Sequence, residues 1–269
     1  MLYATSEQAY SRVAVFGGVY ANHRALRAAI EDARLRGAEA IFCLGDLGAF
    51  GPSPNRVFPL LIESGVHSIR GNYDESISRG LEDCQCGYTD PRDNHFARLS
   101  YRYTFANTSQ RWRDWMGRLP AGRRIRLGSS RLLMSHGSPR RTNEFLWEST
   151  TPSHFLEKLC DDHDADVILA THTGIPWARR LSGDRLFANV GAIGRPANDG
   201  SPAVCYAMLW ADGGAVDVES IPLHYDHEAL AMEMKAERLP EEFIETILTG
   251  WWTTCNEILP MKERRRGRY

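Results

Sequence analysis

Short apolar runs and amphipathic segments alternate through the first quarter of the chain. Three runs have the length and composition of buried strands, at residues 13–16, 40–44 and 66–69. Between them, apolar residues at helical spacing predict helices over about 22–36, which Asn22 can cap, and 54–64. This order of strands and helices is typical of a mostly parallel sheet. We therefore expect an α/β fold.

The remaining pattern predicts further helices and strands within a single domain, residues 1–269. A polar, aromatic-rich insertion over about 75–121 holds two predicted helices and is expected to cap a site. The next predicted elements are a hairpin at 123–127 and 131–134, a helix at 152–161, and strands at 166–170, 186–190, 203–210 and 215–221. Two helices, near 226–237 and 241–250, form a predicted helical extension over about 225–269.

Four polar motifs each follow an apolar run. They are Gly45-Asp46, Gly71-Asn72-Tyr73-Asp74, Ser135-His136-Gly137-Ser138 and Thr171-His172-Thr173-Gly174. Strand ends that meet at one edge of a core would bring these side chains together. Two oxygen and two imidazole donors form a set suited to zinc, manganese or iron. The candidate metal ligands are therefore Asp46, Asn72, His136 and His172.

In this order and spacing the motifs resemble those of the calcineurin-like metallophosphoesterase superfamily. The resemblance covers about residues 12–210 and includes the segment Asn189-Val190-Gly191-Ala192-Ile193-Gly194-Arg195-Pro196. It implies an α/β fold of the calcineurin-like type, a four-layer αββα sandwich of mixed sheets with a small inserted cap. It also implies hydrolysis of phosphate esters at a metal site.

The chain departs from the superfamily pattern at four positions. Gly18 and Tyr20 stand where the first motif has Asp and His, Tyr73 replaces the His of the third motif, and Gly174 replaces the second His of the last. In the superfamily, the first motif and that last His are private ligands of one of two metals. The resemblance therefore implies one divalent transition metal per chain, held by the four remaining ligands, and weak or atypical catalysis.

The expected function is that of a divergent phosphoesterase hydrolysing a small phosphomonoester or phosphodiester through a metal-bound hydroxide. The alternative is a non-hydrolytic binder of a phosphorylated ligand or a partner on the same scaffold. The predicted catalytic residues are Asp46, Tyr73 and Arg140; Arg140 follows a ligand and can pair with a phosphate oxygen. The predicted substrate-binding residues are Asn22, Asp74, Arg140, Asn189 and Arg195.

Cys84 and Cys86 lie in the insertion, close to an Asp and a His. They are candidate soft ligands for a replacement metal. The alternative is a loop with two free thiols, because a Cys-x-Cys without a second pair is a weak zinc signal.

Composition narrows the partners. The 269 residues carry 32 Lys and Arg against 34 Asp and Glu, so the net charge gives no general attraction to nucleic acid or to an anionic membrane. No apolar segment approaches the roughly 18 residues of a membrane span, and the polar start lacks a signal-peptide core. We expect a cytoplasmic protein with a small phosphorylated substrate. The six cysteines are scattered and indicate no disulfide framework, and no motif indicates an oligomeric state.

Overall fold

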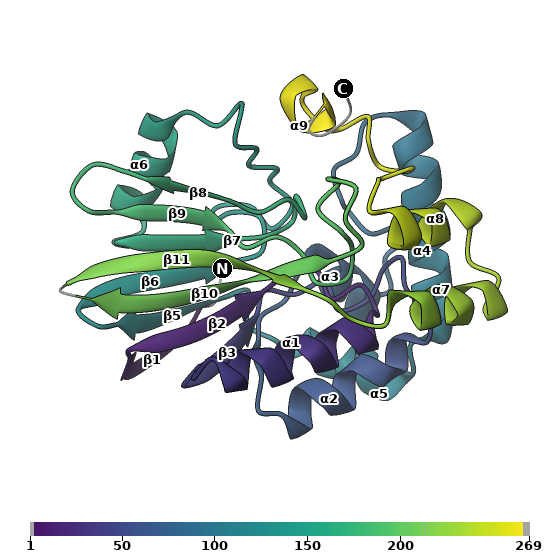
Figure 1. Ribbon diagram of the computed structural model, residues 1–269, viewed down its shortest axis with the longest axis horizontal. Helices are drawn as coiled ribbons and strands as arrows, with labels where there is room; N and C mark the ends of the chain where they lie inside the picture. Colours follow the sequence, from purple (N-terminus) through teal and green to yellow (C-terminus); the bar gives the residue numbers. More distant parts are fainter. Residues whose placement is uncertain (1–2, 213, 266–269) are drawn as a thin grey trace.

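The computed structural model describes residues 3–212 and 214–265, which form two mixed β-sheets with helices on their outer faces (Figure 1). The first sheet has the strand order β1 (Tyr3–Tyr10), β5 (Gly122–Leu127), β6 (Ser130–Ser135), β7 (Val167–Ala170), β9 (Leu186–Asn189) and β8 (Trp177–Arg180). The second has the order β11 (Ala215–Leu223), β10 (Val204–Asp212), β2 (Arg12–Phe16), β3 (Ala40–Cys43) and β4 (His67–Ser68).

Successive side chains of a strand point to opposite faces of its sheet, and each face packs against a different layer. In β2, Val13 and Val15 belong to a core with Leu132 and Leu169 of the first sheet, so they lie between the two sheets. Ala14 and Phe16, on the opposite face of the same strand, belong to a second core that includes residues of α1 (His23–Leu35) and α2 (Val57–Glu63). On the far side, Leu133 and Ile168 pack with residues of α6 (Ser153–Asp162). The expected four-layer αββα sandwich is confirmed.

The helix α1 shows how the sequence specifies its position. Asn22 caps it, because the Asn22 side chain accepts a hydrogen bond from the Ala25 amide at 3.0 Å. Leu26, Ala29, Ile30 and Ala33 are buried at the spacing expected for one apolar face. The next predicted helix divides into a short 3₁₀ turn, η1 (Pro54–Arg56), followed by α2.

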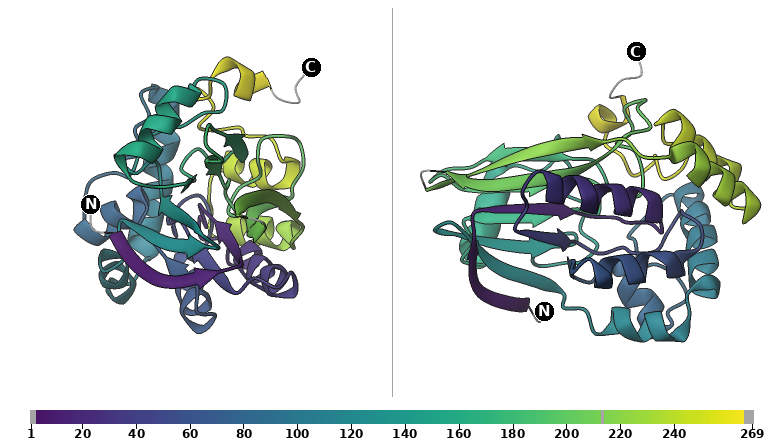
Figure 2. Two further views of the ribbon diagram at one scale, coloured as in Figure 1. Left: turned by 90° about the vertical axis from the view of Figure 1, so that its left-hand side faces the viewer. Right: turned by 60° about the horizontal axis from the view of Figure 1, so that its bottom comes forward.

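The segment after β4 contains three helices, α3 (Asn72–Arg79), α4 (Pro91–Asn107) and α5 (Gln110–Gly117). The helices α7 (His227–Ala236) and α8 (Glu241–Thr249) lie beside α4 at one end of the molecule (Figure 2). Phe96 of α4 packs there with Leu230 and Phe243. The role of this segment as a cap over the site stays a prediction.

Four described elements were not predicted: β1, α3, β8 and α9 (Met261–Arg265). β1 and β8 are the two edge strands of the first sheet, and their sequences are largely polar. An edge strand pairs on one side only, so it does not require an apolar run. No helix among the described residues is long and apolar enough to cross a membrane.

Strand direction positions the polar motifs. β2, β3 and β4 run parallel to one another, and β6, β7 and β9 are parallel in the other sheet. Asp46 follows β3, His136 follows β6 and His172 follows β7. The site therefore forms where the carboxyl ends of strands from both sheets meet.

Candidate metal centre

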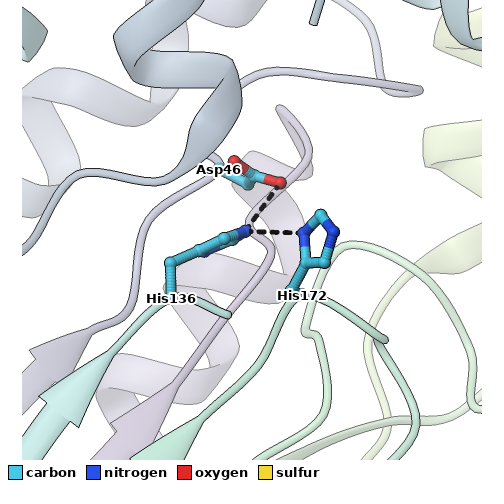
Figure 3. Close-up of side chains that lie close together, drawn as sticks. All are labelled: Asp46, His136 and His172. Carbon is cyan, nitrogen blue, oxygen red and sulfur yellow. Dashed lines mark hydrogen bonds and ion pairs between the residues drawn. The ribbon is translucent and has the colours of Figure 1, made fainter. Parts of the chain in front are cut away.

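Asp46, His136 and His172 point toward one another from three separate loops (Figure 3). His136 Nε2 lies 3.2 Å from Asp46 Oδ2 and 3.2 Å from His172 Nδ1. One ligand atom from each residue falls within 4.8 Å of the others. Both Asp46 and His172 have a positive φ, 55° and 49°, a conformation that non-glycine residues rarely adopt and that collects at functional sites.

Backbone carbonyls orient both imidazoles. His136 Nδ1 lies 2.7 Å from the Leu44 carbonyl oxygen, and His172 Nε2 lies 3.2 Å from that of Cys86. A carbonyl accepts only from a protonated nitrogen, so Nδ1–H of His136 and Nε2–H of His172 are the donors. In the neutral form of each ring, the other nitrogen carries the lone pair and faces the cluster. A carbonyl partner on the outer nitrogen is typical of metal-ligating histidines.

Asn72 has a buried oxygen with no partner. Its amide nitrogen donates to the Cys84 carbonyl at 2.8 Å, whereas Oδ1 has no hydrogen-bond partner among the described residues. The next residue, Tyr73, donates its backbone N–H to Asp46 Oδ1 at 3.0 Å. Asn72 therefore lies in a loop that contacts the loop of Asp46. An orphaned buried amide oxygen costs free energy unless a ligand satisfies it. The four predicted ligands therefore fit a cation of the zinc, manganese or iron class.

Asp74 holds two ligand loops together. Its carboxylate accepts the backbone N–H groups of Asp46, Leu47 and Gly71 at 2.8 to 3.0 Å. It is fully buried, and burial together with the nearby Asp46 raises its pKa to about 6. Asp74 was predicted to bind substrate; the structure instead gives it three backbone partners and no exposed surface.

Gly71 allows the close approach of the ligand loops. A Cβ at this position would lie 2.2 Å from Asp46 Oδ1 and 2.9 Å from His136 Nδ1. No side chain fits there without displacing the ligands. The glycine of this motif is therefore a packing requirement of the site.

The charges of the cluster suit a cation. Burial raises the pKa of Asp46, but the adjacent His136 more than offsets this, so that the pKa lies below its usual value. Burial and the neighbouring His136 lower the pKa of His172 to about 3. An ionised carboxylate and a neutral imidazole are the forms that bind a metal.

Three other predicted site residues form hydrogen bonds within the fold. Tyr73 turns its hydroxyl to Ser100 Oγ of α4, at 3.0 Å. Asn22 is fully buried as the cap of α1. Asn189 donates to the Thr171 carbonyl at 2.6 Å and to Thr173 Oγ1 at 2.9 Å. It therefore holds the loop on both sides of His172. Each of these side chains therefore has protein partners for its polar atoms, and its role toward a substrate stays a prediction.

Arg140 is also engaged. Its Nε donates to Glu144 Oε2 at 2.9 Å, and its guanidinium lies 4.6 Å from the Phe155 ring centroid. The structure does not bring it to the three clustered ligands. The local i,i+4 pairing with Glu144 competes with the phosphate contact that was predicted.

Cys84 and Cys86 are joined in a disulfide. The expectation of two free thiols is therefore wrong, and in this state neither sulfur is a thiolate ligand for a replacement metal. The loop acts through its backbone instead. The Cys84 carbonyl accepts from Asn72, and the Cys86 carbonyl contacts His172.

Aromatic side chains near the cluster were partly missed. The Phe145 ring centroid lies 4.4 Å from that of His172, and Phe145 stacks on Trp147 at 5.5 Å. The sequence analysis did not single out Tyr88, whose ring centroid lies 5.8 Å from that of Phe145, or Trp252, which lies 3.6 Å from a Cβ built at Gly174. A ring in a loop carries no periodic signal, so only the glycines at 18 and 174 could have indicated that bulky neighbours fill the space.

Comparison with known proteins agrees with this geometry. Residues 12–213 match the family model described as the calcineurin-like phosphoesterase superfamily domain. An uncharacterized protein of Methanocaldococcus jannaschii is 24% identical over 254 residues, which cover 89% of this chain and 98% of that protein.

Two solved structures share the fold. A hypothetical protein of Pyrococcus horikoshii superposes with a TM-score of 0.73 at 22% identity, covering 91% of this chain and 100% of that one. A metallophosphoesterase of Sphaerobacter thermophilus gives 0.67 at 23% identity, covering 89% and 99%. Because the family model matches most of the chain, this chain belongs to the calcineurin-like phosphoesterase superfamily.

Proposed function

We propose that this protein is a metal-dependent phosphoesterase that hydrolyses a small phosphomonoester or phosphodiester. Asp46, Asn72, His136 and His172 are the proposed ligands of one divalent transition metal: manganese, zinc or iron. The observation that carries the proposal is the convergence of Asp46, His136 and His172, next in the fold to an Asn72 whose buried Oδ1 has no partner among the described residues. A cation held by the four side chains would satisfy that oxygen.

Each proposed ligand is already oriented for this role. A bound divalent cation would supply Lewis-acid polarisation of a phosphoryl oxygen. The chain itself contributes the carbonyl partners on the outer nitrogens of His136 and His172, which hold both rings in the orientation that a cation would need. Phe145 covers one face of His172 and excludes water from that side.

Metal content and hydrolysis test the proposal together. The purified protein is expected to retain one transition metal per chain by elemental analysis. It should hydrolyse at least one member of a panel of phosphomonoesters and phosphodiesters, and chelation should abolish this activity. His172→Ala should lose both properties, whereas His154→Ala, at an exposed position on α6, should retain them. A protein that binds no metal contradicts the proposal.

A second candidate function is a non-hydrolytic binder of a phosphorylated ligand. The observation in its favour is that Tyr73 and Arg140, two of the predicted catalytic residues, direct their polar groups to Ser100 and Glu144. Binding of metal and of phosphate without turnover of any panel member would favour this candidate.

A further inference from the structure

Gly18 and Gly174, two of the positions that differ from the superfamily pattern, face one small space. A Cβ at Gly18 would lie 2.8 Å from the Ala192 Cβ, and a Cβ at Gly174 would lie 3.8 Å from the same atom. Aromatic side chains occupy the space between them. The Cβ at Gly18 would also lie 2.6 Å from Tyr20 Cζ, and that at Gly174 would lie 3.6 Å from Trp252 Cη2.

Arg195 lies against this aromatic group. Its guanidinium carbon is 3.9 Å from the Trp252 ring centroid and 5.0 Å from that of Phe50. The residue is 5% exposed. Its Nη2 donates to the Thr254 carbonyl, and no carboxylate of the described residues lies within 4 Å of it. A buried guanidinium without a counter-ion is costly, so an anion at this place would be stabilised.

Backbone hydrogen bonds connect Arg195 to the candidate metal centre. The preceding Gly194 donates to the Gly18 carbonyl at 2.8 Å, and Tyr20 donates to the Asp46 carbonyl at 3.1 Å. The Tyr20 hydroxyl lies in the field of both charges: burial raises its pKa most, the Asp46 carboxylate raises it further, and Arg195 lowers it. The guanidinium and the metal ligands therefore flank the same tyrosine.

The other groups that act on Arg195 offer it little counter-charge. Three of them are Cys255, Tyr88 and Tyr20, whose neutral forms predominate near pH 7 because burial raises all three pKa values. The fourth is Asp93, whose Oδ2 accepts the Ile258 amide at 2.9 Å and whose buried Oδ1 has no partner among the described residues; it forms no ion pair with Arg195 within 4 Å and acts on the guanidinium only from a distance.

We propose that Arg195 is an oxyanion-binding residue that takes the place of a second metal ion, pairing with a phosphoryl oxygen of a ligand held next to the metal centre. This inference rests on the proposed function for the identity of that ligand, a small phosphate ester. A guanidinium offers five N–H donors in a planar fork that matches two phosphate oxygens.

Inorganic phosphate is the probe. Isothermal titration of the metal-loaded wild-type protein is compared with Arg195→Met, which keeps an apolar stem over Trp252 but removes the charge. Hydrogen bonds to charged groups contribute about 1.5 to 3 kcal/mol, so phosphate affinity should fall about 10-fold to 150-fold, with metal content unchanged. Arg179→Met is the matched control, because Arg179 also lies over a tryptophan, 5.2 Å from the Trp177 centroid, and donates to backbone carbonyls.

Arg195→Lys keeps the charge and loses the fork, so it should bind phosphate with an affinity between those of wild type and Arg195→Met. If Arg195→Met does not fold, the comparison of Arg195→Lys with wild type decides. Unchanged phosphate affinity in the folded Arg195 variants would overturn the inference and leave Arg195 as a packing residue. The proposed function is judged separately, by metal content and hydrolysis in the wild-type protein, so either can fail without the other.

Discussion

The half of the site around His136 and the half around Gly174 began from the same set of motifs and differ in what fills them. Around His136, small residues such as Gly71 keep side chains away, and the ligand atoms converge. Around Gly174, the rings of Tyr20 and Trp252 occupy the space instead. The comparison teaches that a position without a ligand need not be a void: aromatic rings pack at these glycines, and a guanidinium lies over one of the rings.

The largest effect is expected where the ligands converge. His136→Ala should weaken metal binding more than about 100-fold, because loss of an outer partner alone typically costs 10-fold to 100-fold. His136 is also the residue closest to both other ligands, at 3.2 Å from each. Elemental analysis after dialysis measures the effect, with His154→Ala as control. Retention of a full equivalent of metal would mean that the convergence of these side chains is structural.

Restoring the superfamily residues tests the opposite half. Gly18→Asp with Tyr20→His and Gly174→His should still bind one metal, because Trp252 and Arg195 continue to fill the space. Adding Trp252→Ala and Arg195→Ala should raise the metal content to two per chain. Two metals in the first variant would show that the aromatic packing yields to the new ligands and is no barrier.

The disulfide loop should have an intermediate effect. Cys84→Ser with Cys86→Ser should weaken metal affinity about 10-fold, since the Cys84 and Cys86 carbonyls support Asn72 and His172. A thiol reductant should weaken metal binding of the wild type to a similar extent and leave the double variant unchanged, as measured by competition with a chromogenic chelator. Equal affinities for all four samples would show that the loop keeps its shape without the bond.

The smallest effect is expected at Tyr73. Tyr73→Phe removes the hydrogen bond to Ser100 and should lower the free energy of unfolding by about 1 kcal/mol, with the rate of hydrolysis unchanged. Tyr101→Phe is the matched control, because the Tyr101 hydroxyl is also a hydrogen-bond donor inside the protein, to the Leu81 carbonyl. A fall in kcat confined to Tyr73→Phe would restore the predicted catalytic role of this tyrosine.

The hydrophobic pattern was sufficient for the central strands and for most helices. Strands β2, β3 and β7 are almost entirely buried and, apart from the exposed Arg12 that begins β2, apolar; the apolar face of α1 repeats at helical spacing. The edge strands β1 and β8 lack that signal, since solvent or a single neighbour accepts their polar residues.

The sequence was less informative about the roles of individual polar residues. Asp46, His136 and His172 were identified from motifs alone, and they converge in the structure. Asp74, Asn22 and Asn189 belong to equally polar motifs, yet each directs its side chain to backbone groups. A sequence shows which residues carry donors and acceptors, but the identity of their partners depends on contacts between segments far apart in the chain.

By itself, the sequence determined the superfamily, the layered fold and the set of candidate ligands, because short-range periodicity and local motifs carry that information. Only the tertiary structure decided how the other half of the site is filled. Trp252 reaches Gly174 from the C-terminal segment, and Arg195 stacks on that ring. Close packing admits one occupant for each space, and which side chain occupies it depends on the folded path of the whole chain.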